Sequence, residues 1–208
     1  MDSPRVILIG GAPLSGKTAA ARSIGRRRGM TVVSTDHLGE AARAVTRASS
    51  HPDLHAGHEI DYREYYTAYS PERLVEDALR SHRALWPAIS AVIRRHLAWA
   101  EPAVIEGWAL LPDCVAEMGS AELRSVWIEV PESVLRSRLE GDSDFVRGAA
   151  DPTLLVERFV ARSARMSRWL RSEACEHRLP SIALSGTQSP DQVSLLCLQA
   201  MGIDAATG

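Results

Sequence analysis

Gly11-Ala-Pro-Leu-Ser-Gly16-Lys17-Thr18 is the stretch of sequence that decides the fold. It matches the pattern G-x-x-x-x-G-K-[ST] and stands between an apolar segment, residues 6–9, and an alanine-rich segment. The glycines let backbone N–H groups converge without obstruction by a Cβ atom, and the N-terminus of a following helix adds partial positive charge. A strand, a loop and a helix in this order therefore predict a loop that wraps the β- and γ-phosphates of a nucleotide.

The residues of this loop have separate expected tasks. The Lys17 ammonium reaches the β/γ oxygens, and Thr18 ligates Mg²⁺ through its hydroxyl. An accidental match within a Gly/Pro turn is the alternative, and average residue usage produces one on the order of once in a hundred chains of this length. The predicted nucleotide contacts in this segment are Gly11, Ala12, Pro13, Leu14, Ser15, Gly16, Lys17, Thr18 and Ala19.

Lys17 is the only lysine among the 24 basic residues, and asparagine is absent. GTPases recognise guanine through an Asn-Lys-x-Asp motif, which this chain cannot contain. An N-glycosylation acceptor is excluded too, since that motif begins with asparagine. A small-molecule kinase is then the natural class for the phosphate-binding loop.

The chain has 208 residues, of which 45% are hydrophobic, and a formal net charge of −2. These values predict one globular domain, residues 1–208, and argue against a nucleic-acid partner, because no broad basic field is present. Cys114, Cys175 and Cys197 lack a metal-ligand pattern, which favours free thiols in a reducing compartment. With neither a signal peptide nor a membrane-spanning stretch in the sequence, we expect a cytoplasmic protein without a membrane partner; monomer and homodimer both stay open.

Five short β-branched runs alternate with longer helical patterns. Each run is expected to be a fully buried strand of a doubly wound α/β sheet. The runs are Val6–Ile9, Thr31–Ser34, Ala103–Ile105, Val126–Val130 and Ser181–Leu184.

Capping residues and prolines mark the expected helices. Ser70-Pro71 begins one helix, which Pro87 is expected to break or kink. Pro131-Glu132 begins another, and a long helix is expected over about residues 152–177. Residues 141–148, between these last two helices, are predicted to form a mobile polar loop.

Two predicted strands lead into an acid. Asp36 follows Ser34-Thr35 after the second strand, and Glu106 follows the third. Open α/β sheets bind ligands beyond the carboxyl ends of their strands, so both acids and the phosphate-binding loop are expected to face one crevice. Asp36 is predicted to accept the proton of an acceptor hydroxyl or to hold the metal through water, and the alternative is a helix cap. Glu106 is predicted to lie near Mg²⁺ or the acceptor, and the alternative is a structural carboxylate paired with an arginine.

Arginines around the predicted lid are candidates to neutralise the phosphates, because phosphoryl transfer gains mainly from positioned cations and metal. Arg138 and Arg162 are predicted to contact the nucleotide. The predicted catalytic residues are Lys17, Asp36 and Arg138. Most of the other candidates are expected to be solvated or paired with glutamates such as Glu132. The full set is Arg136, Arg138, Arg147, Arg158, Arg162 and Arg165.

All four tyrosines, at positions 62, 65, 66 and 69, fall on one helical face. They either wall a pocket for an apolar or sugar-like hydroxyl compound or pack the helix on the sheet, and packing on the sheet is the favoured interpretation. The histidines at positions 51, 55 and 58 are expected to be solvated and not metal ligands. Trp108 is a better pocket candidate than Trp127, which is expected to be buried. The predicted acceptor-binding residues are Asp36, Arg43, Tyr62, Glu106 and Trp108.

With these residues in place, the sequence resembles the P-loop small-molecule kinases, and most of all the 2-phosphoglycerate kinases and their relatives. Chloramphenicol phosphotransferases and zeta-toxin-like kinases are more distantly similar. The resemblance implies a three-layer P-loop NTPase fold, a five-stranded parallel sheet in the order 2-3-1-4-5, ATP as donor, and Mg²⁺. It also implies an acceptor-binding insertion at about residues 37–100 and a helical lid at about 136–165. It rests on residues 11–18, 34–38, 86–93, 104–108, 111–112 and 178–182.

The chain departs from these families at two places. In 2-phosphoglycerate kinases an Arg-Glu pair and a later arginine tend to follow the aspartate after the second strand; here the first arginine position is Gly39, while Glu40 and Arg43 remain. The R-x-x-G-R pattern of nucleotide kinases becomes Arg138-Leu-Glu-Gly-Asp142, which lacks the second arginine. These differences weaken the case for a phosphorylated acid and leave the acceptor open.

The sequence thus predicts an ATP-dependent kinase that phosphorylates a hydroxyl group of a small molecule. A regulatory or switch module that binds ATP without transferring its phosphoryl group is the second hypothesis, because a phosphate-binding loop alone does not exclude it. The arginines of the predicted lid and the long insertion favour the kinase, since a switch needs no acceptor pocket.

Overall fold

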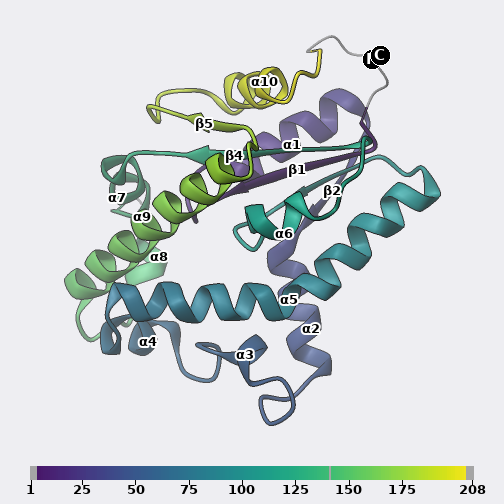
Figure 1. The fold of residues 1–208 in the computed structure, drawn as a ribbon. Coiled ribbons are helices and arrows are strands. Elements are labelled where there is room, and N and C mark those ends of the chain that lie inside the picture. The colour runs from purple at the N-terminus through teal and green to yellow at the C-terminus, as the bar shows by residue number, and fades with distance from the viewer. Residues whose placement is uncertain (1–3, 141, 205–208) are drawn as a thin grey trace.

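The computed structural model describes residues 4–140 and 142–204 (Figure 1). Five parallel strands form one sheet in the predicted order, β2-β3-β1-β4-β5. The strands are β1 Val6–Gly11, β2 Thr31–Ser34, β3 Ala103–Glu106, β4 Leu123–Glu129 and β5 Ser181–Ala183. β4 begins at Leu123, ahead of the predicted apolar run, because its pairing with β1 already starts at Val6.

Helices make up most of the remaining described chain. The two longest are α5, Pro71–Trp99, and α9, Pro152–Glu176. The others are α1 Lys17–Arg28, α2 Thr35–Val45, α3 Pro52–His55, α4 Tyr62–Ala68, α6 Pro112–Ala116, α7 Glu132–Glu140, α8 Ser143–Val146 and α10 Pro190–Ala200.

Helices cover both faces of the sheet, which gives the predicted three layers (Figure 1). Successive side chains of β1 point to opposite faces. Ile7 and Ile9 pack in one core with α1 and α10, whereas Val6 and Leu8 pack in a second core with α5, α6 and α9. All four side chains are fully buried. A strand between two helical layers must be apolar on both faces, and this accounts for the continuous apolar run of β1.

The two outer strands contradict the prediction that every strand is fully buried. Thr31 and Val32 of β2 are exposed, and so are Ser181 and Ala183 of β5. β2 and β5 lie at the edges of the sheet and each pairs with a single strand. A β-branched run therefore identifies a strand without showing whether it is central or at an edge.

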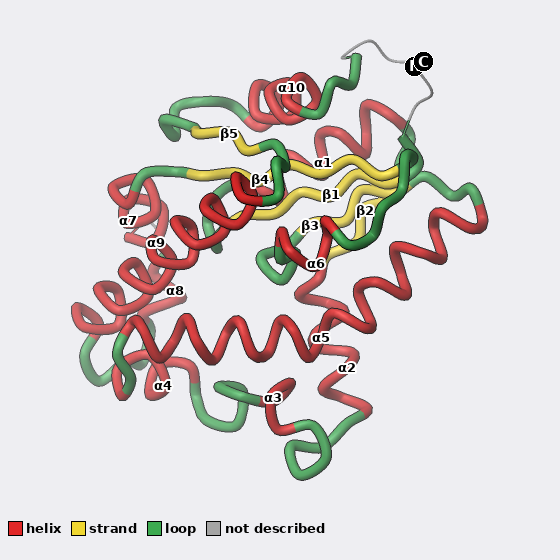
Figure 2. Tube along the Cα trace, in the orientation of Figure 1, coloured by secondary structure: helices red, strands yellow, loops and turns green. Residues whose placement is uncertain are grey.

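Helix ends lie where the capping signals predict them. Ser70 accepts a hydrogen bond from the Arg73 N–H at 3.4 Å, and Pro71 is the first residue of α5. Pro87 does not break α5, which continues as one helix and changes direction along its length (Figure 2). An internal proline removes one hydrogen bond and bends a helix, but packing on both sides keeps the two halves together. α9 begins at Pro152, as predicted.

The segment predicted as a mobile polar loop contains the short helix α8. Its N-cap, Asp142, accepts hydrogen bonds from the N–H groups of Asp144 and Phe145. Aspartate and serine favour loops but are also preferred helix caps, and the prediction took only the first possibility into account. Gly141, the first residue of the predicted loop, lies outside the described residues.

Cys114, Cys175 and Cys197 are free thiols, as predicted. Cys197 is buried, and burial raises its pKa to about 12. Among the helices of residues 4–140 and 142–204, none combines the length and the hydropathy that a bilayer span requires.

Gly10→Ala should strongly destabilise the fold. Gly10 pairs with Trp127 of β4, and a Cβ atom at position 10 would overlap the indole ring. The ring is fixed, because Trp127 is buried and its Nε1–H donates to the Leu110 carbonyl at 3.0 Å. We expect the free energy of unfolding, measured with urea, to fall by about 3 kcal/mol.

Val45→Ala, at a residue that is 84% exposed, is the control for this substitution. It should change the free energy of unfolding by less than about 0.5 kcal/mol. An equally small change for Gly10→Ala would show that the indole does not occupy this space.

Candidate active site

The loop between β1 and α1 has the backbone of an anion-binding loop. Gly16 is the N-cap of α1, with a φ of 98° that favours glycine, and it supplies no side chain to the first N–H groups of the helix. Leu14 also has a positive φ, 62°, without being glycine. Because the N–H groups of a first helical turn lack intrahelical partners, they are left for a bound phosphate.

Lys17 is buried in this loop. The residue is 7% exposed, and its Nζ donates to the Ala12 carbonyl at 2.8 Å. Burial lowers the pKa of Lys17 to about 8; the charges of Glu106 and Asp36 oppose this shift, and the charge of Arg162 adds to it. These three residues therefore lie around one ammonium group, which keeps its proton at neutral pH.

The two predicted acids lie at the same edge of the sheet. Glu106 ends β3, is 3% exposed and pairs in register with Ile9 of β1 and with Ser34 of β2. Asp36 lies in the first turn of α2, and the N-cap of that helix is Ser34, which accepts from the Asp36 N–H at 3.3 Å. Capping is thus not the task of the Asp36 carboxylate. Within the described ranges no arginine forms an ion pair with Glu106, so both structural alternatives fail.

A cavity of about 350 Å³ lies next to this edge. Asp36 and Arg162, whose charges act on Lys17, both line it, which connects the cavity to the phosphate-binding loop. Its volume is in the range of small-molecule sites. Of the predicted acceptor-binding residues, Glu106 does not line the cavity, whereas four do: Asp36, Arg43, Tyr62 and Trp108. Trp127 is buried away from it, as predicted.

The favoured interpretation of the four tyrosines is wrong. α4 packs against α9 and lies away from the sheet (Figure 1). Tyr62, Tyr65 and Tyr66 line the cavity, while Tyr69 follows the end of α4 and is 42% exposed. The Tyr62 hydroxyl donates to the Phe145 carbonyl of α8 at 2.6 Å. Helical spacing shows that residues share a face, but it does not show which surface that face contacts.

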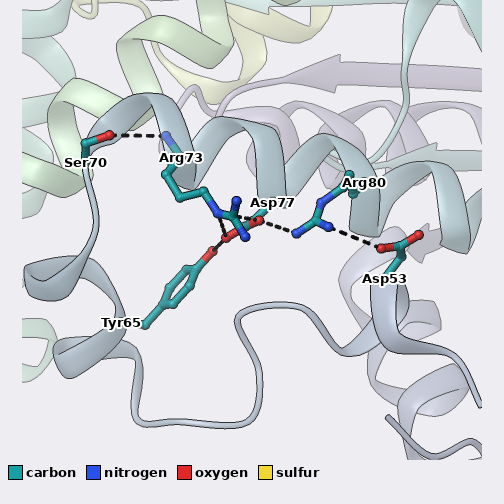
Figure 3. Close-up of polar contacts among 6 residues, drawn as sticks. All are labelled: Asp53, Tyr65, Ser70, Arg73, Asp77 and Arg80. Atoms are coloured by element: carbon teal, nitrogen blue, oxygen red, sulfur yellow. Dashed lines mark hydrogen bonds and ion pairs between the residues drawn. The ribbon is translucent and has the colours of Figure 1, made fainter. Parts of the chain in front are cut away.

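A group of charged residues holds Tyr65 in place (Figure 3). The Tyr65 hydroxyl donates to Asp77 at 2.8 Å, and Asp77 also accepts from Arg73 at 3.1 Å and from Arg80 at 2.5 Å. Arg80 in turn lies 3.5 Å from Asp53 of α3. Burial, followed by the hydrogen bond to Asp77, raises the pKa of Tyr65. Since its hydroxyl is engaged in this group, Tyr65 offers the cavity an aromatic wall.

Arg162 of α9 is a buried cation without a carboxylate partner in the described part of the chain. It is 2% exposed, and its Nη1 has no hydrogen-bond partner there. Nη2 donates to the Tyr66 hydroxyl, and the guanidinium lies 4.5 Å from the centroid of the Trp108 ring. Burial lowers the pKa of Arg162 to about 9. A buried charge with unused N–H groups is costly, and a bound anion would compensate it.

Arg138 of α7 reaches the phosphate-binding loop itself, because its Nη1 donates to the Leu14 carbonyl at 2.6 Å. Arg158 does not line the cavity. The remaining candidates pair with carboxylates instead: Arg136 with Glu132, Arg147 with Asp144 and Arg165 with Glu72. Of the six predicted arginines, Arg138 therefore contacts the phosphate-binding loop and Arg162 lines the cavity.

His82 is a residue of the cavity that sequence reasoning missed. It lies on α5, is 4% exposed, and its Nδ1 has no hydrogen-bond partner in the described residues. Ala78 and Leu85, one turn to either side on the same helical face, also line the cavity. The helical spacing of these three residues was the one sign in the sequence that they share a face, and no local motif marks the histidine.

Gly39, which stands where 2-phosphoglycerate kinases tend to have an arginine, makes room for Arg43. A Cβ atom at position 39 would lie 3.1 Å from Nη2 of Arg43. Arg43 lines the cavity and pairs with Glu40 at 2.8 Å. Arg43, the arginine that remains after the second strand, therefore supplies a cation to the cavity wall.

The predicted metal ligands fit Mg²⁺ in type and number, because this ion takes one or two protein oxygens and fills its other positions with phosphates and water. Thr18 lies exposed in the first turn of α1, and the Glu106 carboxylate acts on the neighbouring Lys17.

The three histidines do not form a metal site. Across the described ranges there is no group of three or more His, Cys, Asp or Glu side chains that could hold an ion. His51 is exposed, as predicted. His58 is exposed as well, although it lines the rim of the cavity, whereas His55 is partly buried and its Nε2 lies 2.9 Å from the Thr46 hydroxyl, so solvation was the wrong expectation for His55 alone.

Solved structures of several kinases resemble this chain. A sugar kinase from Janibacter sp. HTCC2649 is 19% identical with a TM-score of 0.55, over 96% of this chain and 95% of that chain. A gluconokinase from Sinorhizobium meliloti 1021 is 18% identical with a TM-score of 0.56, over 97% and 94%. A dephospho-CoA kinase from Campylobacter jejuni is 10% identical with a TM-score of 0.50, over 95% and 96%. No protein-family model and no curated protein matches the chain. At these identities the likeness shows the fold, which is the α/β fold of the P-loop kinases.

Nucleotide affinity should fall as the pH rises through about 8, the pKa of Lys17. Below this pH the ammonium is already charged; above it, binding of the phosphates requires uptake of a proton, so affinity falls by up to about tenfold per pH unit. Calorimetric titration with ADP at pH values from about 6.5 to about 9.5, on both sides of that pKa, measures this change in affinity.

Lys17→Met should bind ADP weakly and without this fall, because it has no proton to lose. A wild-type affinity that stays constant across the range would mean that Lys17 has an ordinary pKa.

Proposed function

We propose that the protein is a kinase that transfers the γ-phosphoryl group of ATP, with Mg²⁺, to a hydroxyl group of a small molecule. One observation carries this proposal: Asp36 and Arg162, which line the cavity, also act electrostatically on Lys17 of the phosphate-binding loop. A donor site and an acceptor site therefore share one boundary. The fold common to the solved sugar kinase and gluconokinase supports the same reaction class.

The donor would be held by the loop between β1 and α1. Backbone N–H groups of the segment from Gly11 to Ala19 would surround the phosphates, and Lys17 would contact the β/γ oxygens. Thr18 and Glu106 would hold Mg²⁺, which would neutralise negative charge on the phosphates. Arg138 steadies the loop through the Leu14 carbonyl.

Asp36 would accept the proton of the attacking hydroxyl. Its carboxylate is exposed to the cavity and is not used as a helix cap. Arg162 lines the same cavity and has a buried N–H group without a partner, which would suit the phosphoryl oxygens as they move from donor to acceptor. Asp36 would thus take the proton from the acceptor hydroxyl, and Arg162 would stabilise the charge on the phosphoryl group.

The acceptor would lie in the cavity against Trp108, with Arg43 and Tyr62 as further contacts. α2, α4 and α5, in the predicted insertion of about residues 37–100, supply most of the lining. The lid of about residues 136–165 includes α8, which the Tyr62 hydroxyl contacts. We therefore treat the chain as one kinase domain in which insertion and lid close over the same substrate.

Asp36→Asn should lower turnover by about a thousandfold and leave nucleotide affinity within about threefold, because the amide cannot accept the proton. ADP release with a panel of sugars, sugar acids and simple alcohols measures turnover, and calorimetry measures nucleotide affinity. Glu176→Gln, which removes an exposed carboxylate at the far end of α9, should leave both unchanged.

Near wild-type turnover in Asp36→Asn would remove the proposed base. Tight nucleotide binding without product from any compound of the panel would contradict the kinase and favour a nucleotide-binding switch.

Arg162→Met should separate stability from activity. Its guanidinium is desolvated and incompletely bonded, so a methionine of similar length should keep the free energy of unfolding within about 1 kcal/mol of wild type, or raise it. Turnover should fall by about a hundredfold, because the transferring phosphoryl group loses a cation. Urea denaturation and ADP release measure the two effects, and a large loss of stability with turnover preserved would assign Arg162 a structural role.

A further inference from the structure

His82 lines the cavity next to Trp108. The His82 ring lies edge-on to the Trp108 ring, with 4.2 Å between centroids and 86° between planes. Arg162 lies over the same indole, 4.5 Å from its centroid. The indole thus has the buried cation on one side and the buried imidazole on another, and Arg162 is the one of these two whose charge acts on Lys17.

The imidazole is desolvated and incompletely bonded. Burial, followed by the charges of His58 and Arg43, lowers the pKa of His82 to about 3, so the ring is neutral. A neutral imidazole has one N–H donor and one acceptor nitrogen, whichever tautomer forms. Nδ1 is buried without a partner in the described residues. A ligand group that both donates and accepts hydrogen bonds would satisfy this ring.

The charged groups in the same part of the cavity are compensated. Arg43 pairs with Glu40 at 2.8 Å, and the Arg43 side chain is only 14% exposed. Burial and the Arg43 charge lower the pKa of His58, which favours its neutral form. The uncompensated cation, Arg162, acts on Lys17, whereas the charges that act on His82 are those of His58 and Arg43. An acid bound near His82 would therefore lose hydration without gaining a free cation.

Much of the remaining wall is apolar or aromatic, although Thr35 and Ser81 line the cavity too. Tyr65 contributes its ring, because its hydroxyl is engaged by Asp77 (Figure 3). Gly57 lets this ring approach, since a Cβ atom there would lie 2.7 Å from the Tyr65 Cζ. Leu74, Ala78 and Leu85 of α5 line the same space. Flat aromatic walls around about 350 Å³ suit a compound built on a single ring.

We propose that the acceptor is an uncharged ring compound with a hydroxyl at the Asp36 end and an uncharged hydrogen-bonding group at the other, and that His82 selects this second group. The proposal rests on the proposed function and names its substrate class. It also sets the site apart from one built for acids, which would present a free cation where His82 lies.

Two pairs of compounds that differ only in charge test this selection: mandelamide against mandelate, and D-glucuronamide against D-glucuronate. Their dissociation constants are measured by ligand-observed NMR on the full chain, with a non-hydrolysable ATP analogue and Mg²⁺ present. In at least one pair the amide should bind about tenfold more tightly than the acid. Equal or tighter binding of the acids in both pairs, or no binding of either amide, would overturn the proposal.

Two substitutions at position 82 identify the residue responsible. His82→Phe keeps a ring but no hydrogen-bonding atoms, and it should weaken amide binding by about tenfold. His82→Gln keeps a donor and an acceptor, and it should stay within about threefold of wild type. Ser90→Ala, a buried polar residue of α5 that does not line the cavity, is the matched control and should change neither affinity.

Unchanged affinity for the ATP analogue in all three variants shows that they fold. An amide affinity that is the same in His82→Phe as in wild type would overturn the assignment of His82. Since these measurements need no phosphoryl transfer, their failure leaves the kinase reaction untouched. The proposed function fails separately, if amides bind as expected but no compound of the activity panel is phosphorylated.

Discussion

Burial of the Lys17 ammonium is the interaction on which the rest of the site depends. Desolvation opposes the charge and lowers the pKa of Lys17, and the charges of Glu106 and Asp36 oppose that shift. Those acids can act together because β2 and β3 are neighbours whose carboxyl ends meet at one edge of the sheet. The strand order thus has a direct electrostatic consequence. Arginine serves as the basic residue everywhere else in the chain, whereas a compact ammonium suits the tight space of this loop.

The fold was predictable because its signals are local or repeat along the chain. The apolar runs identified all five strands, Ser70 and Pro152 marked helix starts, and the glycine-rich loop located the carboxyl edge of the sheet. The exposure of β2 and β5 was not predictable, because it depends on position within the sheet. The same limit explains the tyrosines, whose shared face was correctly recognised but whose contact surface depends on how α4 meets α9.

The site was predictable only where a motif or a strand end marks it. Lys17, Asp36 and Glu106 belong to that part, and they lie together in the structure. His82 and the group around Asp77 do not, because they depend on the packing of α5 against α3 and α4. The cavity accordingly combines two chemically distinct kinds of group. Arg162, whose charge acts on Lys17, is an uncompensated buried cation, whereas His82 is a neutral imidazole among aromatic walls.

The central claim is that donor phosphates anchored on Lys17 meet the acceptor between Asp36 and Arg162. A crystal structure with ADP, Mg²⁺ and aluminium fluoride, which imitates the transferring phosphoryl group, tests it most directly. We expect the fluoride ligands to contact Lys17 and the Nη1 of Arg162, with the metal on Thr18. Asp36 should lie about 3 Å from the oxygen in the attacking position. Phosphates bound elsewhere, or a fluoride group facing away from the cavity that Asp36 lines, would contradict the account.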